Sequence, residues 1–191
     1  LIMMTMIQNA FSNSSSSIMI GKIQGNIVDI LMPPLSATEL LVGHVAGAVT
    51  RGLLCGAFVA LIMIPFMELS IKNVVALVYF SLTANTILAL LGVMAGIWAE
   101  KFDQMAAVTN FIITPLSFLS GTFYPLDRLP DAWQWVALIN PFFYMIDGFR
   151  TAFLGQSESN LWIGAAYIFL ITAGLWVWTL LLLRRGYKIK S

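Results

Sequence analysis

Residues Gly121 to Gly155 read GTFYPLDRLPDAWQWVALINPFFYMIDGFRTAFLG and lie between two uncharged segments that are long enough to cross a bilayer. The stretch cannot cross one itself, because its apolar core from Ala132 to Ile146 is shorter than the roughly 20 residues of a spanning helix, and prolines interrupt the stretch around it. It is rich in Trp, Tyr and Phe, which favour a membrane–water interface. The pattern predicts two short helices that dip into one face of a membrane and return, as a gate on a transport path would.

The composition of the rest of the chain supports a membrane location. Apolar residues make up 59% and charged residues 10%, against about 25% charged residues in soluble domains. The net charge of +1 gives no reason to expect nucleic-acid binding. Because the chain opens at Leu1 inside a hydrophobic run, we expect it to be a fragment that has lost its N-terminus. A cytoplasmic N-terminus would add one span upstream of Leu1, six in all.

We therefore predict an all-α, polytopic transmembrane bundle that forms one domain over residues 1–191. Five spans are visible in the sequence: Leu1 to Ile20, Thr38 to Met67, Asn73 to Ala99, Gln104 to Ser120 and Leu161 to Leu183. The fourth is expected to kink or break near Pro115. The serine run from Ser12 to Ser17 leaves two alternatives open for the first, a polar linker or a helix with hydroxyls bonded to its own backbone.

Small residues mark the expected helix contacts in the second span. Gly43, Gly47, Gly52 and Gly56 recur on closely related faces, and such spacing lets helices approach each other in lipid.

The loop from Gly21 to Glu39 is the longest polar segment between the spans. Its apolar residues recur at helical spacing, which predicts a short amphipathic helix. Pro33 and Pro34 end that helix, and Ser36 with Glu39 forms a capping-box pattern that starts the next one. Such a helix lies flat on lipid or fits a groove of a partner protein, and the sequence favours the partner.

Basic residues predict the orientation, because they are enriched in cytoplasmic loops. With a cytoplasmic C-terminus, seven of the ten basic residues lie inside: Lys22, Arg51, Lys101, Arg184, Arg185, Lys188 and Lys190. Lys72, Arg128 and Arg150 lie outside. The region from Gly121 to Gly155 is then extracellular.

The last three spans contain no Asp, Glu, Lys, Arg or His. Ion-coupled carriers need ionisable groups near the midplane, so uphill transport would draw its energy from another subunit. A passive channel or secondary carrier is the alternative. The chain has one histidine and no G-x-S-x-G elbow, which disfavours an enzyme. Thr83, Asn85, Thr86 and Asn110 predict either interhelical hydrogen bonds or a polar substrate path.

The outer region also has a simpler interpretation. Its aromatic residues, Trp133, Trp135, Phe142, Phe143 and Tyr144, could form only a belt at the lipid headgroups. A headgroup belt does not explain why the region from Gly121 to Gly155 also contains prolines and charged residues. Asp147 and Arg150 are spaced to pair on one helical face, and we predict that reversing both charges restores what either reversal disrupts.

Two motifs resemble those of the ABC-2 type transporter permeases, the membrane subunits of ATP-binding-cassette exporters. The first is QGNIVDILMPPLSATELLVG, from Gln24 to Gly43. The second combines FLSGTFYPLDRLP, INPFFYMIDGFR and FLG, and the resemblance covers essentially the whole chain. Gln24 departs from the family pattern, in which a Glu is usual.

The resemblance implies a bacterial inner-membrane exporter with six helices per subunit, a second permease copy as homodimer or heterodimer, and separate ATPase subunits that hold ATP and Mg²⁺. No cofactor is implied for this chain. The implied coupling residues are Gln24, Asp29, Ile30, Leu31, Pro33, Pro34 and Glu39. The implied outer-gate residues are Gly121, Phe123, Tyr124, Pro125, Asn140, Pro141, Asp147 and Arg150. Our own expectation for the substrate is a molecule that is amphipathic, lipid-like, a saccharide or a drug.

Overall fold

The computed structural model describes residues 1–24, 36–66, 70–121, 131–155, 157 and 159–185, and every regular element within them is a helix. The elements are α1 (Ile2–Ile23), α3 (Ala37–Met63), α4 (Val74–Trp98), α5 (Phe102–Val108), the π-helix η1 (Thr109–Ile113), α6 (Thr114–Phe118), α7 (Asp131–Ile139), α8 (Pro141–Leu154) and α9 (Leu161–Arg185). The all-α class predicted from the sequence is confirmed for this part of the chain.

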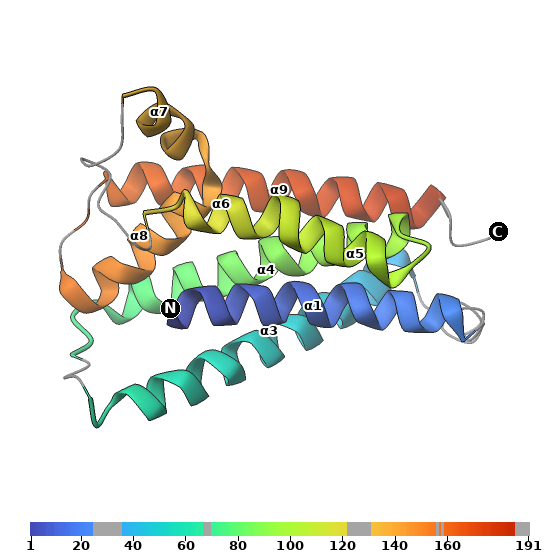
Figure 1. The fold of residues 1–191 in the computed structure, drawn as a ribbon, viewed down its shortest axis with the longest axis horizontal. Helices are drawn as coiled ribbons and strands as arrows, with labels where there is room; N and C mark the ends of the chain where they lie inside the picture. Colours follow the sequence, from blue (N-terminus) through green and yellow to red (C-terminus); the bar gives the residue numbers. More distant parts are fainter. Residues whose placement is uncertain (25–35, 67–69, 122–130, 156, 158, 186–191) are drawn as a thin grey trace.

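Three helices are long and apolar enough to cross a membrane, namely α3, α4 and α9. Each matches a predicted span closely, since α4 begins one residue after Asn73 and α9 extends two residues beyond Leu183. The other two predicted spans are also helical, as α1 and as the run from α5 to α6. Figure 1 shows these rods lying alongside one another, with α7 displaced to one side.

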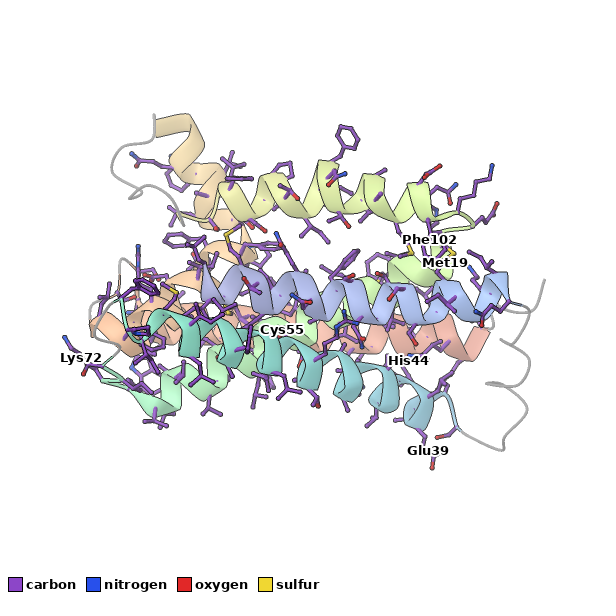
Figure 2. The ribbon with its side chains drawn as sticks, turned by 60° about the horizontal axis from the view of Figure 1, so that its bottom comes forward. Met19, Glu39, His44, Cys55, Lys72 and Phe102 are labelled. Atoms are coloured by element: carbon purple, nitrogen blue, oxygen red, sulfur yellow. The ribbon has the colours of Figure 1, made fainter. Side chains whose placement is uncertain are left out.

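The segments that connect the long helices lie at two opposite ends of the bundle. Met19, Glu39 and Phe102 lie at one end and Lys72 at the other (Figure 2). We call the first the Lys22 end, because Lys22 of α1 bonds to α4 there, and the second the Asp147 end, after the buried aspartate of α8. The alternating direction of the helices follows from the chain passing back and forth between these two ends (Figure 1).

Helix α1 packs closely against α4 at the centre of the bundle. A Cβ atom at Gly92 would lie 2.1 Å from the Ser14 Oγ and 2.6 Å from the Phe11 carbonyl oxygen, so only glycine fits there. Ser14 and Ser15 are fully buried, and the Ser14 Oγ donates to the Ala10 carbonyl at 3.1 Å. The linker alternative for the serine run is therefore wrong: the hydroxyls are satisfied by their own helix.

The predicted glycine stripe of α3 is a packing face only in its second half. Cβ atoms at Gly52 and Gly56 would collide with Met6 of α1, whereas Gly43 and Gly47 have no neighbouring atom within 4 Å. The close contact between α1 and α3 thus lies toward the Asp147 end.

The expected irregularity near Pro115 is confirmed and has a local form. The π-helix η1 directly precedes Thr114 and Pro115, and the Thr114 backbone N–H donates to the Thr109 carbonyl, five residues earlier. Proline lacks an N–H and its ring clashes with the carbonyl four residues before it, so the wider turn accommodates Pro115 without ending the rod.

Candidate functional site

The Asp147 end holds a buried carboxylate with several hydrogen-bond donors. Asp147 is 2% exposed, and its Oδ1 accepts from the Arg150 Nη2 at 3.0 Å. Its Oδ2 accepts from the Ser157 Oγ at 2.7 Å, the Ser159 Oγ at 2.6 Å and the Ser159 backbone N–H at 3.0 Å. We call these four residues the Asp147 cluster. The predicted Asp147–Arg150 pair is confirmed.

The two serines of this cluster were not predicted as site residues. They belong to the connection between α8 and α9, so the carboxylate joins the end of one helix to the approach of the next. A buried carboxylate is stable only when paired and hydrogen-bonded. The cluster therefore holds the α8–α9 connection against α8.

Asn140 holds the junction between the two short helices α7 and α8. Its Oδ1 accepts from the Phe142 N–H at 3.0 Å and so caps α8, while Pro141 occupies the first turn, where no N–H is needed. Its Nδ2 donates to the Leu116 carbonyl at 2.7 Å, one of the last carbonyls of α6. One buried side chain thus satisfies two helix ends and ties the α7–α8 junction to α6.

Tyrosines connect the same region to α9 and α4. The Tyr167 hydroxyl of α9 donates to the Ile139 carbonyl at the end of α7 at 2.7 Å, and the Tyr79 hydroxyl of α4 donates to the Ala165 carbonyl at 2.8 Å. Tyr144 of α8 packs edge-on against Tyr167, with ring centroids 5.1 Å apart. Burial, with smaller contributions from Tyr167 and Asp147, raises the pKa of Tyr144.

The aromatic residues of α7 and α8 divide between core and surface. Phe142 and Phe143 are 2% and 1% exposed and pack inside the bundle, whereas Trp135 is 70% exposed. A headgroup belt accounts for Trp135 but not for the two phenylalanines, so the belt alone does not explain this region.

Five of the predicted gate residues are described and cluster at the Asp147 end. Gly121 has a left-handed φ of 74° just beyond α6 and lines the same cavity as Arg150. Asn140, Pro141 and Asp147 lie in or next to α8. Phe123, Tyr124 and Pro125 lie outside the described residues.

At the opposite end, Lys22 joins the end of α1 to the end of α4. Its ammonium group donates to three carbonyls at the C-terminus of α4: Gly96 at 3.2 Å, Ile97 at 2.5 Å and Ala99 at 3.0 Å. The last carbonyls of a helix lack partners and carry partial negative charge, which a cation stabilises. Sequence reasoning used Lys22 only for orientation. Its place in the last turn of α1 was the available signal, but its partners come from another helix.

A second lysine, Lys72, also donates to a carbonyl at a helix end, here at the Asp147 end. The Lys72 ammonium group donates to the Leu154 carbonyl at 2.8 Å, and the Lys72 backbone N–H donates to the Ala152 carbonyl at 2.8 Å. Lys72 thus holds the approach to α4 against the end of α8.

The predicted coupling residues flank a segment that is not described. Gln24 is the C-cap of α1, which continues through Ile23, so residues 21–23 belong to the first helix. Ser36 and Glu39 form the expected capping box: the Ser36 Oγ accepts from the Glu39 N–H at 3.2 Å, and Glu39 accepts from the Ser36 N–H at 2.7 Å. Asp29, Ile30, Leu31, Pro33 and Pro34 lie outside the described residues.

The polar residues of α4 bond within their own helix. Thr83 and Thr86 donate to the Tyr79 and Leu82 carbonyls, and the Asn85 Nδ2 donates to the Ser81 carbonyl, each at 2.7 Å. Of the two alternatives predicted for these three side chains, interhelical hydrogen bonds are not borne out, because the bonds described for them stay within α4. Among the described residues, the buried Asn85 Oδ1 has no hydrogen-bond partner, and it faces Gly52 of α3. Asn110 is exposed.

No group of His, Cys, Asp or Glu that could hold a metal ion occurs in the described parts of the chain. The chemistry present is that of helix-end capping and helix packing. Such an arrangement can transmit movement between two ends of a bundle, and nothing in the described geometry resembles a nucleophile with its base.

Comparison with known proteins gives the family context. The family model for the ABC-2 type transporter matches residues 1–154. The inner membrane transport permease YadH of Escherichia coli strain K12 is 35% identical over 190 residues, which are 98% of this chain and 74% of that protein. Nodulation protein J of Rhizobium leguminosarum bv. viciae is 33% identical over 172 residues, 86% of this chain and 65% of that protein. No solved structure matches the chain significantly.

Proposed function

Because this chain belongs to the ABC-2 type transporter family, we propose that it is the transport permease subunit of an exporter driven by separate ATPase subunits. The proposed assembly sits in a bacterial inner membrane and contains a second permease copy, identical or closely related. ATP and Mg²⁺ are held by the ATPase. The proposed substrate is amphipathic, lipid-like, a saccharide or a drug.

The observation that carries this proposal is the grouping of helix ends at the Lys22 end. The end of α1, the capped start of α3 and the turn between α4 and α5 all lie there, as does the far end of α9 (Figures 1 and 2). Of the basic residues that the structure describes, Lys22, Lys101, Arg184 and Arg185 belong to these segments, whereas Lys72 and Arg150 lie toward the Asp147 end. Positive loops favour the cytoplasmic side, where an ATPase would dock on the loop between Gln24 and Ser36.

With the Lys22 end on the cytoplasmic side, the chain has five membrane spans: α1, α3, α4, the run from α5 to α6, and α9. Helices α7 and α8 then form an extracellular re-entrant pair. Support comes from the shortness of α7 and α8 beside α4 and α9, and from the absence of Asp, Glu, Lys, Arg and His along α4. A chain without an ion relay in that helix needs an external source of energy for uphill transport.

The proposed mechanism passes force from one end of the bundle to the other. ATP closes the two ATPase subunits, which push the loop that follows Gln24. Lys22 passes this displacement from α1 to the end of α4 through its three carbonyl contacts. Helix α4 meets α8 at Gly148, where a Cβ atom would lie 2.4 Å from the Phe80 ring, so its movement reaches the proposed outer gate.

Shortening the coupling loop is the direct test of this function. In the complex with its ATPase, a cysteine at Trp135 in a Cys55→Ala background reports on the Asp147 end. We expect ATP with vanadate to change the maleimide labelling rate of this cysteine. Deleting Asp29 and Ile30, or replacing Pro33 and Pro34 with alanine, should abolish the change while membrane insertion is retained. An unaltered change in these variants would refute the coupling assignment.

Lys22 offers a second prediction with a matched control. Lys22→Met should lower the free energy of unfolding by about 2 kcal/mol, because three carbonyls lose a charged donor, and should reduce the ATP-dependent change at residue 135. Lys22→Arg should restore most of both. The exposed Lys101 is the control, and Lys101→Met should alter neither. If Lys22→Met lowers stability but leaves the ATP response intact, Lys22 is only a helix cap.

A further inference from the structure

The outer face of α1 is polar along the middle of the helix. Between residues 5 and 17, every residue of α1 that is not buried has a polar side chain. Most of these residues are three or four positions apart, which places them on one side of the helix. We call them the α1 polar face: Thr5, Gln8, Asn9, Ser12, Asn13, Ser16 and Ser17.

The other long helices have apolar side chains on their outer surfaces. Phe58 of α3, Val78 of α4 and Leu170 of α9 are 64%, 51% and 69% exposed. Such side chains suit lipid, whereas amide and hydroxyl groups placed in hydrocarbon lose the hydrogen bonds that water gives them. The α1 polar face therefore requires water or another polar surface beside it.

Arg51 of α3 adds a positive charge next to this face. Its Nη1 donates to the Asn13 Oδ1 at 3.1 Å, and its side chain is exposed. Helix α3 runs from Ala37 to Met63, so any stretch of about 20 residues with which it crosses a membrane includes Arg51. The orientation argument counted Arg51 among the cytoplasmic basic residues, but its place near the middle of α3 makes it a cation at membrane depth.

No carboxylate pairs with Arg51 within the parts of the chain that the structure describes. Helix α1 contains no Asp or Glu, and the one acidic residue of α3 is Glu39 in its first turn. A guanidinium group keeps its proton in proteins, so deprotonation cannot remove the charge. Charged residues at this depth face water-filled cavities and mark substrate paths, and a cation without a counter-ion favours an anionic occupant.

We propose that the α1 polar face and Arg51 line the path of the transported molecule, and that its head group is an anionic saccharide. This inference rests on the proposed exporter function and narrows its substrate class. The amide and hydroxyl groups of the face both donate and accept hydrogen bonds, as sugar hydroxyls do. Arg51 supplies the fork of donors that matches a carboxylate, sulfate or phosphate on the sugar.

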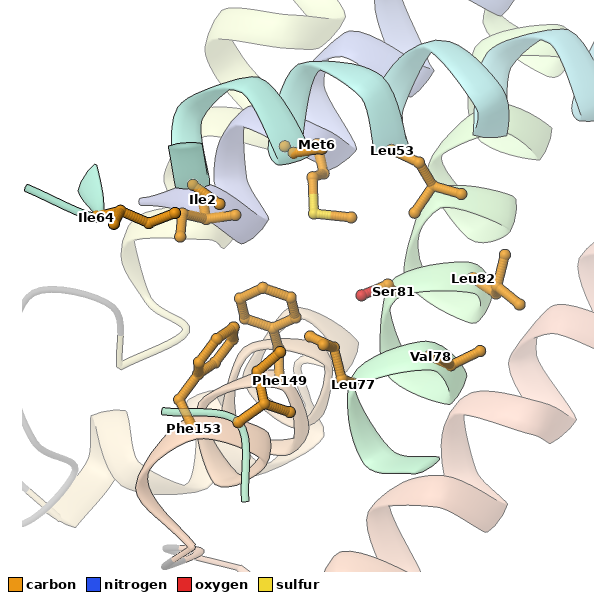
Figure 3. A pocket seen from close by; sticks show the side chains of 14 residues that line it. Ile2, Met6, Leu53, Ile64, Leu77, Val78, Ser81, Leu82, Phe149 and Phe153 are labelled. Atoms are coloured by element: carbon orange, nitrogen blue, oxygen red, sulfur yellow. The ribbon is translucent and has the colours of Figure 1, made fainter. Parts of the chain in front are cut away.

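The apolar cavity of about 450 Å³ between α1, α3, α4 and α8 is a poorer place for such a head group. Figure 3 shows Met6 of α1 pointing into it, and Ser81 is the one polar residue among the described residues that line it. None of the α1 polar face lines this cavity.

A dry contact between the α1 polar faces of two permease copies is also a poorer fit. In a two-fold interface the same patch of each copy meets itself, so the contact would enclose the Arg51 guanidinium groups of both copies. Neither α1 nor the middle of α3 offers a carboxylate to compensate them, and uncompensated buried charges are strongly destabilising.

The first test measures water access to the face in membrane vesicles. Single cysteines replace Ser12, Ser16 or Leu170 in the full-length permease with Cys55→Ala. Methanethiosulfonate reagents attack thiolates, which form in water and not in hydrocarbon. Ser12→Cys and Ser16→Cys should react, whereas Leu170→Cys, on the apolar outer surface near the middle of α9, should not.

Two outcomes of this test would overturn the proposal. Protection of all three cysteines would place the α1 polar face out of contact with water. Oxidation of Ser12→Cys to a disulfide between copies, without reaction toward the reagents, would identify the face as a contact between two permeases.

The second test measures the sign of the charge along the path. The reaction rate of the anionic ethylsulfonate reagent at Ser12→Cys, divided by that of the cationic trimethylammonium reagent, should fall about tenfold in Arg51→Gln, as expected for one nearby unit charge in a watery medium. Arg51→Lys should retain most of the ratio. Lys101→Gln, at an exposed site outside α3, is the control and should leave it unchanged. A ratio that Arg51→Gln does not alter would refute the role of Arg51.

The third test addresses the substrate class with two probes that differ by one carboxylate. Dodecyl glucuronide, kept below its micelle concentration, should slow the labelling of Ser12→Cys more than dodecyl glucoside does, and Arg51→Gln should remove this difference. Equal protection by the two probes when Arg51 is present would overturn the anionic assignment. These labelling measurements need no ATPase, so their failure is distinguishable from a failure of the exporter function, which the ATP response at residue 135 tests.

Discussion

Replacing Asp147 with alanine is expected to lower the free energy of unfolding by about 3 kcal/mol, near the lower limit for breaking a buried ion pair. Its carboxylate is 2% exposed and accepts from Arg150, Ser157 and Ser159. The substitution removes the acceptor of both serine hydroxyls and leaves the Ser159 backbone N–H with only its longer contact to the Ser157 Oγ at 3.3 Å. Partial exposure of Arg150 moderates the loss, because water can solvate its guanidinium group.

The measurement is unfolding of the purified protein in mixed micelles by titration with a denaturing detergent. Asp103→Ala is the matched control, since Asp103 is an exposed carboxylate in the first turn of α5, and surface changes of this kind stay within about 0.5 kcal/mol. Similar losses for the two variants would show that the Asp147 cluster contributes nothing beyond an ordinary surface charge.

The structure also changes the expected result of the double charge reversal. The sequence alone predicted that Asp147→Arg with Arg150→Asp would restore the pair. In the structure, position 147 must also accept from the Ser159 backbone N–H and two serine hydroxyls. An arginine has no acceptor, so we now expect the double variant to recover only part of the loss.

Replacing Gly92 with alanine is expected to be the most damaging methyl addition in α4. The new Cβ would lie 2.1 Å from the Ser14 Oγ and 2.6 Å from the Phe11 backbone oxygen. A hydroxyl can rotate away, but the Phe11 carbonyl belongs to α1 and moves only with the helix. We expect a loss of about 1–3 kcal/mol from overpacking, measured by the same unfolding titration.

Gly174→Ala in α9 provides the comparison, because no atom lies within 4 Å of its added Cβ. Alanine there should be neutral or stabilising by up to about 1 kcal/mol, since it favours the helix. Combining Gly92→Ala with Ser14→Ala should recover only part of the loss, because the backbone clash remains. Full recovery would mean that the side chain, and not the approach of the two helices, limits the site.

Local signals in the sequence predicted the elements well. Apolar length located α4 and α9, the Ser36–Glu39 spacing predicted the cap of α3, and the Pro115 irregularity appears as the π-helix beside it. The Asp147–Arg150 pair was predictable because both residues lie on one helix, three positions apart. The apolar runs are read along one continuous segment, and the cap, the irregularity and the ion pair are each set by residues within about two helical turns of one another.

The contacts between distant segments were not predictable in the same way. Lys22 donates to carbonyls of α4, and Asn140 donates to a carbonyl of α6. Every residue has a main-chain carbonyl, so the residue types in a sequence do not indicate which carbonyl will accept such a bond. The glycine stripe of α3 shows the same limit, since Gly43 and Gly52 look equivalent by spacing while only Gly52 meets another helix. Which part of a stripe packs depends on where the neighbouring helices run.

The measurement that bears most directly on the proposed function is site-specific photo-cross-linking of the full-length permease to its ATPase subunit. A photoreactive amino acid replaces Asp29, in the proposed coupling loop, or Asn160, exposed at the opposite end before α9. We predict a cross-link to the ATPase from position 29 and none from position 160. A cross-link from position 160, or a stable complex that never cross-links at position 29, would contradict ATPase docking at the Lys22 end.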